Sequence, residues 1–317
     1  MTGRILRRIL SFLMTLFIVS LFVFASISLS LGDSSSFVLS DEASVEAIES
    51  YREAKGLNDN ILLRYLRFIK SFFVLDWGKT IGGEEIRKVI MNRLPVTLSL
   101  SLYSILFSII FSTLVVFFTL RKRRQGEGKL INVLSSIFLV LPSFLTSLIL
   151  VMVFSLWLKL FPISGYSRIN NGFISHFRSL FLPSLTLSLL HSSIIMRIMY
   201  TTLKESLDMP YTNTALSKGM KENRLVISSS LKPSLPVFFT LVSDSMATAF
   251  GGSCVVENVF ALPGIGSLLV KGALERDASL VSICVMVVAF LVSFVFLISD
   301  LLSDAVDPRR RRAYEKA

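Results

Sequence analysis

Apolar residues are concentrated along this 317-residue chain in six long blocks that are separated by polar segments. Each block is long enough to cross a bilayer, because about 20 mostly apolar residues in a helix span the hydrocarbon core. A helix also satisfies its backbone hydrogen bonds internally, which lipid cannot do. The blocks extend approximately over residues Ile9–Leu31, Val96–Leu120, Ile131–Leu160, Leu180–Tyr200, Pro236–Val256 and Leu280–Leu302. The pattern predicts an all-α integral membrane protein with about six transmembrane helices.

The first and third blocks have features that bear on this prediction. Arginines precede the first block and small residues follow it, as in a cleavable signal peptide, but its apolar run exceeds the roughly 7–15 residues of a signal core. We therefore expect a retained helix, with cleavage as the alternative. The third block contains Pro142 in its first half, and its length leaves room for a tilt or a bend.

The long polar segment between the first two blocks predicts two short helices. Asp41–Lys55 has Ser40 as a candidate N-cap and Gly56 just past its end. In Ile61–Leu75, apolar residues recur at helical spacing, which is typical of an amphipathic helix. We expect its apolar face to rest on the ends of the spans or on the membrane surface, and direct contact with a substrate is the alternative.

Composition supports the membrane assignment, and the charges predict an orientation. Apolar residues make up 52% of the chain and charged residues 17%, whereas a soluble domain has about a quarter charged residues. The formal net charge of +11 comes from lysines and arginines that gather on one predicted side of the membrane. By the positive-inside rule, both termini are cytoplasmic, and Arg309–Arg312 lies at the anionic inner leaflet. The basic excess therefore indicates topology and not nucleic-acid binding.

These assignments divide the chain into three parts. We predict an N-terminal transmembrane helix at residues 1–31, an extracytoplasmic loop with short helices at 32–94, and a five-helix core at 95–317. The core includes a cytoplasmic loop at about residues 201–235.

The sequence shows little that is arranged for catalysis. Gly78-Lys79-Thr80 resembles the end of a phosphate-binding P-loop, but Phe73 stands where the first glycine of that motif is required. The two cysteines lack metal-ligand or redox spacing. No Ser/His/Asp arrangement or metal-ligand cluster is visible in the sequence. We therefore expect no catalytic residue, no metal site and no cofactor bound by this chain.

Two polar residues within the predicted spans are candidates for lining a transport pathway. A carboxylate at membrane depth is costly and usually faces a cavity or a partner, so Asp244 either lines a pathway or forms a structural pair. His191 either lines the pathway or is packed and hydrogen-bonded among the helices.

The most informative segment is the predicted cytoplasmic loop between the fourth and fifth blocks. Residues 208–224 read DMPYTNTALSKGMKENR, which predicts a short helix, a glycine and a second helix that re-enters the membrane near Pro233 and Pro236. Such an elbow presents a compact knob to a partner protein.

This loop resembles the coupling loop of ABC importer permeases, and most closely that of the dipeptide/oligopeptide/nickel branch, in the subunit usually encoded first of two. The branch typically shows Tyr-x-x-Thr-Ala-x-x-Lys-Gly, which Tyr211, Thr214, Ala215, Lys218 and Gly219 match. The resemblance extends over nearly the whole chain. Further matching segments are Asp76-Trp77-Gly78, Arg93-Leu94-Pro95, Pro142-Ser143-Phe144, Phe161-Pro162-Ile163-Ser164-Gly165-Tyr166, Pro263-Gly264-Ile265-Gly266 and Asp307-Pro308-Arg309.

The resemblance implies a type I ABC importer permease fold in the bacterial cytoplasmic (inner) membrane. It implies a second permease subunit, two ATP-binding subunits that hydrolyse ATP and an extracytoplasmic substrate-binding protein. Contact with the ATP-binding subunits is expected from Tyr211 to Gly219, with Lys221 and Arg224 as supporting charges.

The expected cargo is a di- or oligopeptide, and the alternative within the family is nickel or another small solute. Two alternatives lie outside the family: a secondary transporter driven by an ion gradient, which Asp244 would serve, and a membrane-bound enzyme or assembly factor. ATP-independent uptake would favour the secondary transporter. Copurification with an ATP-binding subunit would argue against the enzyme or assembly factor.

Overall fold

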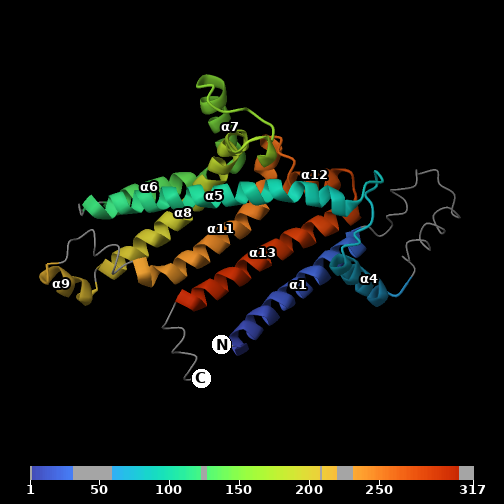
Figure 1. Ribbon diagram of the computed structural model, residues 1–317, viewed down its shortest axis with the longest axis horizontal. Coiled ribbons are helices and arrows are strands. Elements are labelled where there is room, and N and C mark those ends of the chain that lie inside the picture. The colour runs from blue at the N-terminus through green and yellow to red at the C-terminus, as the bar shows by residue number, and fades with distance from the viewer. Residues whose placement is uncertain (1, 31–58, 123–126, 208, 220–230, 307–317) are drawn as a thin grey trace. The chain divides into compact units, whose positions relative to one another are not determined.

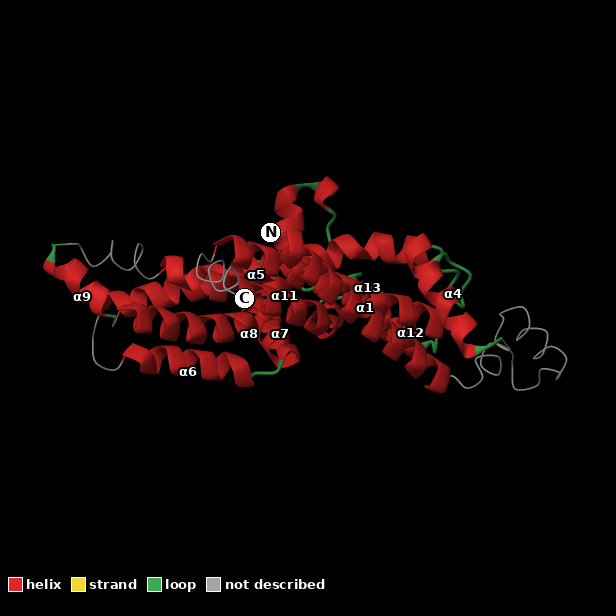
Figure 2. Cartoon of the chain, turned by 90° about the horizontal axis from the view of Figure 1, so that it is seen from below, coloured by secondary structure: helices red, strands yellow, loops and turns green. Residues whose placement is uncertain are grey.

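The computed structural model describes residues 2–30, 59–122, 127–207, 209–219 and 231–306 (Figure 1). Within these ranges the chain is helical, apart from loops and one isolated bridge between Lys79 and Glu85 (Figure 2). The predicted helix Asp41–Lys55, with Ser40 and Gly56, lies outside the described residues. The helices are α1 (Thr2–Ser30), α4 (Ile61–Val74), α5 (Ile86–Lys122), α6 (Glu127–Val140), α7 (Ser143–Leu150), η1 (Val151–Trp157), η2 (Ile169–Asn171), α8 (Phe173–Leu207), α9 (Pro210–Ser217), α11 (Leu231–Val259), α12 (Ile265–Leu274) and α13 (Ala278–Val306).

The membrane-spanning prediction is confirmed by the lengths and composition of these helices. Five of them, α1, α5, α8, α11 and α13, are long and apolar enough to cross a bilayer. A sixth span follows if α6 and the continuous α7–η1 segment count as one broken helix, which bends by 99°. The break falls at Pro142, whose backbone is extended (φ −60°, ψ 140°) and which has no N–H to continue the α6 ladder. The bend allowed for in the third block is therefore present.

Two spans begin earlier than the apolar blocks predicted. α5 starts at Ile86 and passes through Pro95, and α8 starts at Phe173 and passes through Pro183. A proline inside a helix removes one backbone hydrogen bond, and the second predicted span starts directly after Pro95. Packing outweighs that loss in α5, whose first turns contribute the fully buried Ile86 and Ile90 to a core.

The chain forms two compact units by its internal contacts, Met1–Thr97 with Pro263–Ser293, and Leu98–Leu262 with Phe294–Ala317. We call them unit 1 and unit 2. The division into residues 1–31, 32–94 and 95–317 follows the predicted topology and stays a prediction.

Unit 1 has an apolar core built from α1, α4, α12 and parts of α5 and α13. Its buried members are Val23, Phe72, Trp77, Ile86, Ile90, Ile265, Leu268, Leu280, Ile283, Cys284, Met286 and Val287. The predicted amphipathic helix at Ile61–Leu75 is confirmed as α4. Its Asn60 cap accepts a hydrogen bond from the Leu62 N–H, and its Tyr65 hydroxyl lies 2.8 Å from the Ser20 hydroxyl of α1.

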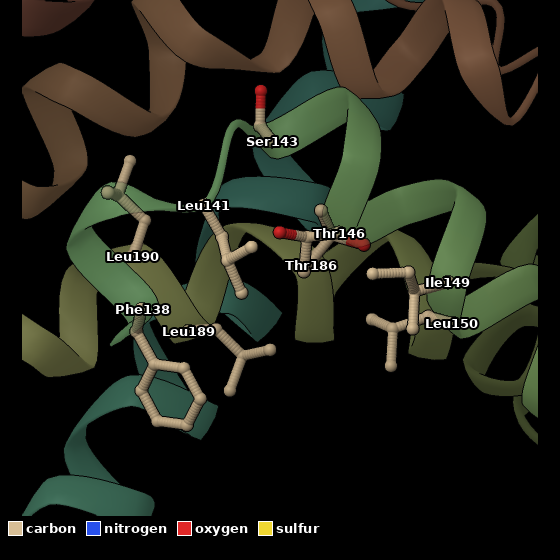
Figure 3. Close-up of a pocket in the computed structure, with 9 residues that line it drawn as sticks. All are labelled: Phe138, Leu141, Ser143, Thr146, Ile149, Leu150, Thr186, Leu189 and Leu190. Atoms are coloured by element: carbon tan, nitrogen blue, oxygen red, sulfur yellow. The ribbon is translucent and has the colours of Figure 1, made fainter. Parts of the chain in front are cut away.

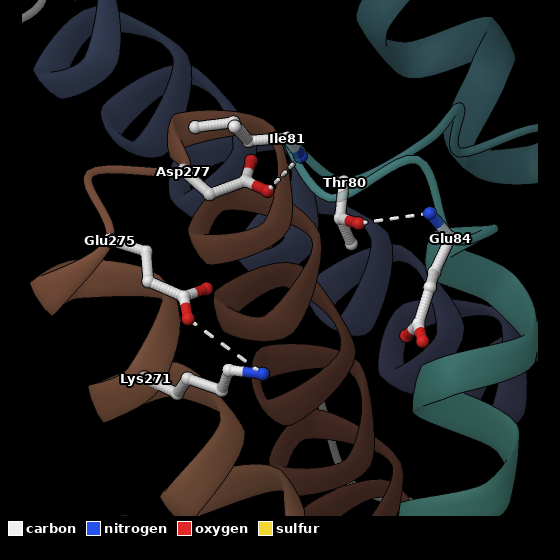
Figure 4. A network of polar contacts seen from close by, with 6 residues as sticks. All are labelled: Thr80, Ile81, Glu84, Lys271, Glu275 and Asp277. Atoms are coloured by element: carbon white, nitrogen blue, oxygen red, sulfur yellow. Dashed lines mark hydrogen bonds and ion pairs between the residues drawn. The ribbon is translucent and has the colours of Figure 1, made fainter.

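A buried carboxylate ties two distant segments of unit 1 together. Asp277 is 3% exposed and accepts hydrogen bonds from the backbone N–H groups of Ile81 (2.8 Å) and Leu280 (3.0 Å). It thus caps the start of α13 and holds the loop that precedes α5. Figure 4 shows Asp277 directed at Ile81, with Lys271 and Glu275 paired nearby on the α12 side. We call Asp277 and its two bonds the Asp277 network.

In unit 2, α8 packs against α5 through serines whose hydroxyls bond the neighbouring helix backbone. Ser108 Oγ donates to the Ser188 carbonyl and Ser112 Oγ to the Ser192 carbonyl, both at 3.1 Å. Such small hydroxyl side chains allow close helix approach in a membrane and satisfy their own polar atoms. α8 is also the most buried of the candidate spans, with α6, α7 and α11 packed around it.

Candidate functional site

The predicted short helix of the loop is present as α9, and we call Pro210–Gly219 the α9 segment. Pro210 is its first residue, a position where the missing N–H of proline has no helical partner to lose. The Thr214 hydroxyl donates to the Pro210 carbonyl at 3.2 Å, and the Lys218 N–H donates to the Thr214 carbonyl at 3.2 Å. These bonds are local, so the segment has the compact form of a knob.

Gly219 ends the segment in a left-handed conformation, with φ at +82°. A Cβ built on it meets no atom within 4 Å, so there is room in the isolated chain for a side chain. The conformation, and not the space, therefore requires glycine here, because other residues adopt this φ only with strain.

The predicted coupling residues differ in how far the structure describes them. Thr214, Lys218 and Gly219 are exposed and Ala215 is half-buried. Tyr211 lies in α9, but its side chain is not among the described parts of the chain, and Lys221 and Arg224 lie outside the described residues. Figure 1 shows α9 beyond the ends of α8 and α11. The exposed part of the segment is therefore accessible to a partner.

The predicted second helix is α11, which begins at Leu231, so Pro233 and Pro236 lie in its first two turns. Farther along, α11 has an exposed face of polar and small residues. Asp244 and Thr248 are one turn apart on this face, and Gly251 and Gly252 continue it with open space around both glycines. An exposed carboxylate in a membrane span faces water or a partner, since lipid would not solvate its charge.

His191 of α8 lies behind this face of α11. The ring is 1% exposed, and its Nδ1 atom lies 3.4 Å from the Thr248 hydroxyl oxygen. Its Nε2 atom is buried and has no hydrogen-bond partner within the described ranges. The packed alternative therefore describes His191 better than the exposed pathway-lining one, and Asp244 is the residue that reaches the surface.

Thr248 connects the two candidates and was missed in the sequence. Its hydroxyl also donates to the Asp244 carbonyl at 2.8 Å, so it bridges the backbone of α11 and the His191 ring. A threonine within an apolar block does not by itself indicate a functional residue. Its position one helical turn after Asp244 was the feature that could have identified it. Across the described residues, no group of three or more His, Cys, Asp or Glu side chains is placed to hold a metal ion.

A small cavity of about 130 Å³ lies at the bend between α6 and α7 (Figure 3). It is lined by Phe138, Leu141, Ser143, Thr146, Ile149, Leu150, Thr186, Leu189 and Leu190. The Thr146 and Thr186 hydroxyls donate to carbonyls of their own helical turns, Pro142 and Leu182, so their protons are already used. The lining of the cavity is mostly apolar.

Comparison with known protein families decides the class of this chain. A sequence model described as "Binding-protein-dependent transport system inner membrane component" matches residues 127–312, more than half of the chain. The chain belongs to this family. A second model, described as "Binding-prot-dependent transport system membrane comp, N-term", matches residues 1–101. The matches include the α9 segment, α11 and α4.

Individual relatives agree with the family over nearly the whole length. A protein named "Nickel import system permease protein NikB" from Staphylococcus aureus strain MRSA252 is 28% identical over 311 residues, covering 97% of this chain and 91% of the relative. Its counterpart from strain USA300 is 28% identical over 310 residues, covering 96% and 91%. The chain is therefore an ABC importer permease of the peptide/nickel family and a multi-pass inner-membrane protein, and the resemblance read from its loop is confirmed.

Proposed function

We propose that this permease forms half of a pathway across the cytoplasmic membrane, beside a second permease subunit. Two ATP-binding subunits supply the energy from the cytoplasmic side, and an extracytoplasmic protein delivers the cargo. The excess of lysine and arginine on one side of the spans supports an orientation with both termini and the α9 segment in the cytoplasm.

The α9 segment is the contact for an ATP-binding subunit in this proposal. The observation that carries it is a short helix, Pro210–Ser217, whose described residues are mostly exposed and which leads to a left-handed glycine beyond the ends of α8 and α11. Because α9 follows α8 directly in the sequence, a displacement of α9 by an ATP-binding subunit would move the end of a membrane span. ATP stays on the partner subunits, and this chain binds no cofactor of its own.

The exposed face of α11 lines the pathway in the same proposal. Asp244 contributes a negative charge and Thr248 a hydroxyl group, and Gly251 and Gly252 leave the helix backbone accessible. The buried His191 contacts Thr248 from the protein side. A face of this kind interacts better with water and a hydrated cargo than with lipid.

Two cargoes have separate support. The similarity of the chain to permeases named for nickel import favours nickel or a nickel complex. The chain has only two histidines, so direct nickel ligation by this chain is disfavoured, which supports peptides. At 28% identity the scaffold is shared while the binding protein selects the cargo, so peptide uptake stays a prediction beside nickel uptake.

Uptake by the assembled transporter in proteoliposomes tests the proposal. Radioactive Ni²⁺ and a labelled dipeptide are offered separately with the binding protein, with ATP or a non-hydrolysable analogue enclosed. We expect accumulation of one cargo only with hydrolysable ATP. Accumulation with the analogue and an imposed ion gradient would favour the secondary-transporter alternative and contradict the proposal.

A further inference from the structure

Helix α4 has an inward face that anchors it to the first span. Tyr65 makes edge contacts with Phe17 and Phe24 at ring-centroid distances of 6.2 and 5.4 Å, and its hydroxyl lies 2.8 Å from that of Ser20. Phe68 packs against Phe24 at 6.0 Å. All of these α1 residues fall within its candidate membrane span, Leu6–Ser26.

These contacts place α4 at a defined depth. Ser20 lies six residues before the end of the span at Ser26, which is about 9 Å along a helix that rises roughly 1.5 Å per residue. A helix bonded to α1 at that level is beside the hydrocarbon or headgroup region of the bilayer and not in bulk water.

A second apolar face of α4 is exposed among the described residues of unit 1. Leu62, Leu66 and Phe73 are 66%, 61% and 64% exposed, and with the half-buried Ile69 they follow at intervals of four, three and four residues. That spacing places them on one side of the helix, next to the inward face. The stripe is therefore continuous and not a scatter of single surface residues.

The remaining side of α4 carries two exposed cations between the exposed Leu63 and Val74. Arg67 and Lys70 are exposed, and Arg67 pairs with the exposed Asp59 at 2.6 Å. Arg64 lies over the Phe24 ring at 6.0 Å, on the flank nearest α1. An apolar stripe beside exposed cations is the pattern of helices that lie in the plane of a membrane surface.

We propose that α4 lies in the lipid–water interface, with Leu62, Leu66 and Phe73 against acyl chains and Arg67 and Lys70 at headgroup phosphates. Two observations favour lipid over a protein partner as the occupant of the stripe. Tyr65 holds α4 at the depth of the bilayer, and the stripe lies between the inward face of α4 and the side that carries Arg67 and Lys70. The helix then fixes the end of α1 and the adjoining unit 1 core at the membrane surface, and the proposal does not depend on how ATP is coupled.

Fluorescence quenching in the assembled transporter, held in lipid nanodiscs, tests this placement. A bimane label is attached at Leu66→Cys or, as the matched control one turn away, Lys70→Cys. Both are made with Cys254→Ala, while the fully buried Cys284 is kept. We expect doxyl-labelled lipid to quench the label at 66 about threefold more than at 70, and aqueous iodide to show the reverse order.

A label at Phe22→Cys, on the exposed side of the first span, gives the reference for full lipid contact. Stronger iodide quenching at 66 than at 70 would overturn the proposal in favour of a water-facing stripe. Protection of position 66 from both quenchers would overturn it in favour of a protein partner. Addition of the binding protein would then show whether that partner is the docked protein or the second permease.

Discussion

The Asp277 network and the α9 segment are both small polar features next to long apolar helices, but they are held in opposite ways. Asp277 is buried and bonds both Leu280 and Ile81, and Ile81 lies 196 positions before it in sequence. The described side chains of the α9 segment are mostly exposed, and the bonds at Thr214 and Lys218 stay within one turn. The first feature is completed by its own chain, whereas we propose that the second is completed by a partner.

The largest expected effect is a loss of uptake from a substitution in the α9 segment that leaves the fold unchanged. Gly219→Arg places a bulky side chain at a φ of +82° on the proposed ATPase contact, so we expect uptake to fall to background. Membrane insertion should be unchanged, because no described residue comes within 4 Å of a Cβ at this position. Uptake in proteoliposomes and the amount of protein in the membrane measure the two effects.

Gly172→Arg is the matched control. Gly172 is also exposed, has φ at +113° and has open space around it, but it ends η2 in a different loop of unit 2. We expect it to keep most of the uptake. Equal loss in both variants would attribute the effect to backbone strain and not to a partner contact.

The next effect is on stability and falls on the other region. Asp277→Ala leaves two N–H groups without their acceptor, which should lower the free energy of unfolding by about 3 kcal/mol. Asp277→Asn keeps one carbonyl oxygen and should lose less. Thermal unfolding in detergent measures this, and an unchanged midpoint for the alanine variant would contradict the role given to the network.

A smaller effect concerns transport and leaves both regions intact. Asp244→Asn removes the charge from the exposed face of α11, and we expect uptake of a cationic cargo to fall about fivefold, equivalent to about 1 kcal/mol. Thermal stability should not change, because the carboxylate is exposed. A loss of stability without a loss of uptake would support the structural alternative for Asp244.

The last prediction compares two threonines and includes the smallest expected effect, that of Thr214→Val. The buried Thr97 hydroxyl accepts the Ile265 N–H at 2.8 Å in unit 1, so Thr97→Val should cost about 1–2 kcal/mol. Thr214 is exposed and bonds its own helical turn, so Thr214→Val should change stability by less than about 0.5 kcal/mol. Unfolding of both variants in the same detergent makes the comparison, and equal losses would erase the distinction between the two regions.

The long spans and the α9 segment could be predicted from sequence, for different reasons. Spans are visible because lipid demands uninterrupted apolar helices, and α9 because Pro210 and Gly219 mark its two ends. The early starts of α5 and α8 were not visible in the apolar pattern, because their first turns contain charged and polar residues as well as apolar ones. In α5, the burial of Ile86 holds those turns in the helix. The bend at Pro142 was foreseeable, but its angle depends on tertiary contacts.

The contacts that join distant segments were also beyond prediction. Asp277 looks like an ordinary loop residue, and its bond to Ile81 exists only once α12 and the loop before α5 pack together. Asp244 and His191 were both singled out as membrane polar residues, but burial separates them: one is exposed, and the other is covered beside Thr248.

Cross-linking from the α9 segment tests the central claim most directly. A photoreactive benzophenone is attached at Lys218→Cys, an exposed position, or at Gly172→Cys as the control, each with Cys254→Ala in the assembled transporter. The account predicts that position 218 forms an adduct with an ATP-binding subunit and that position 172 forms none. Adducts of position 218 with lipid alone, or an ATP-binding-subunit adduct at position 172, would contradict it.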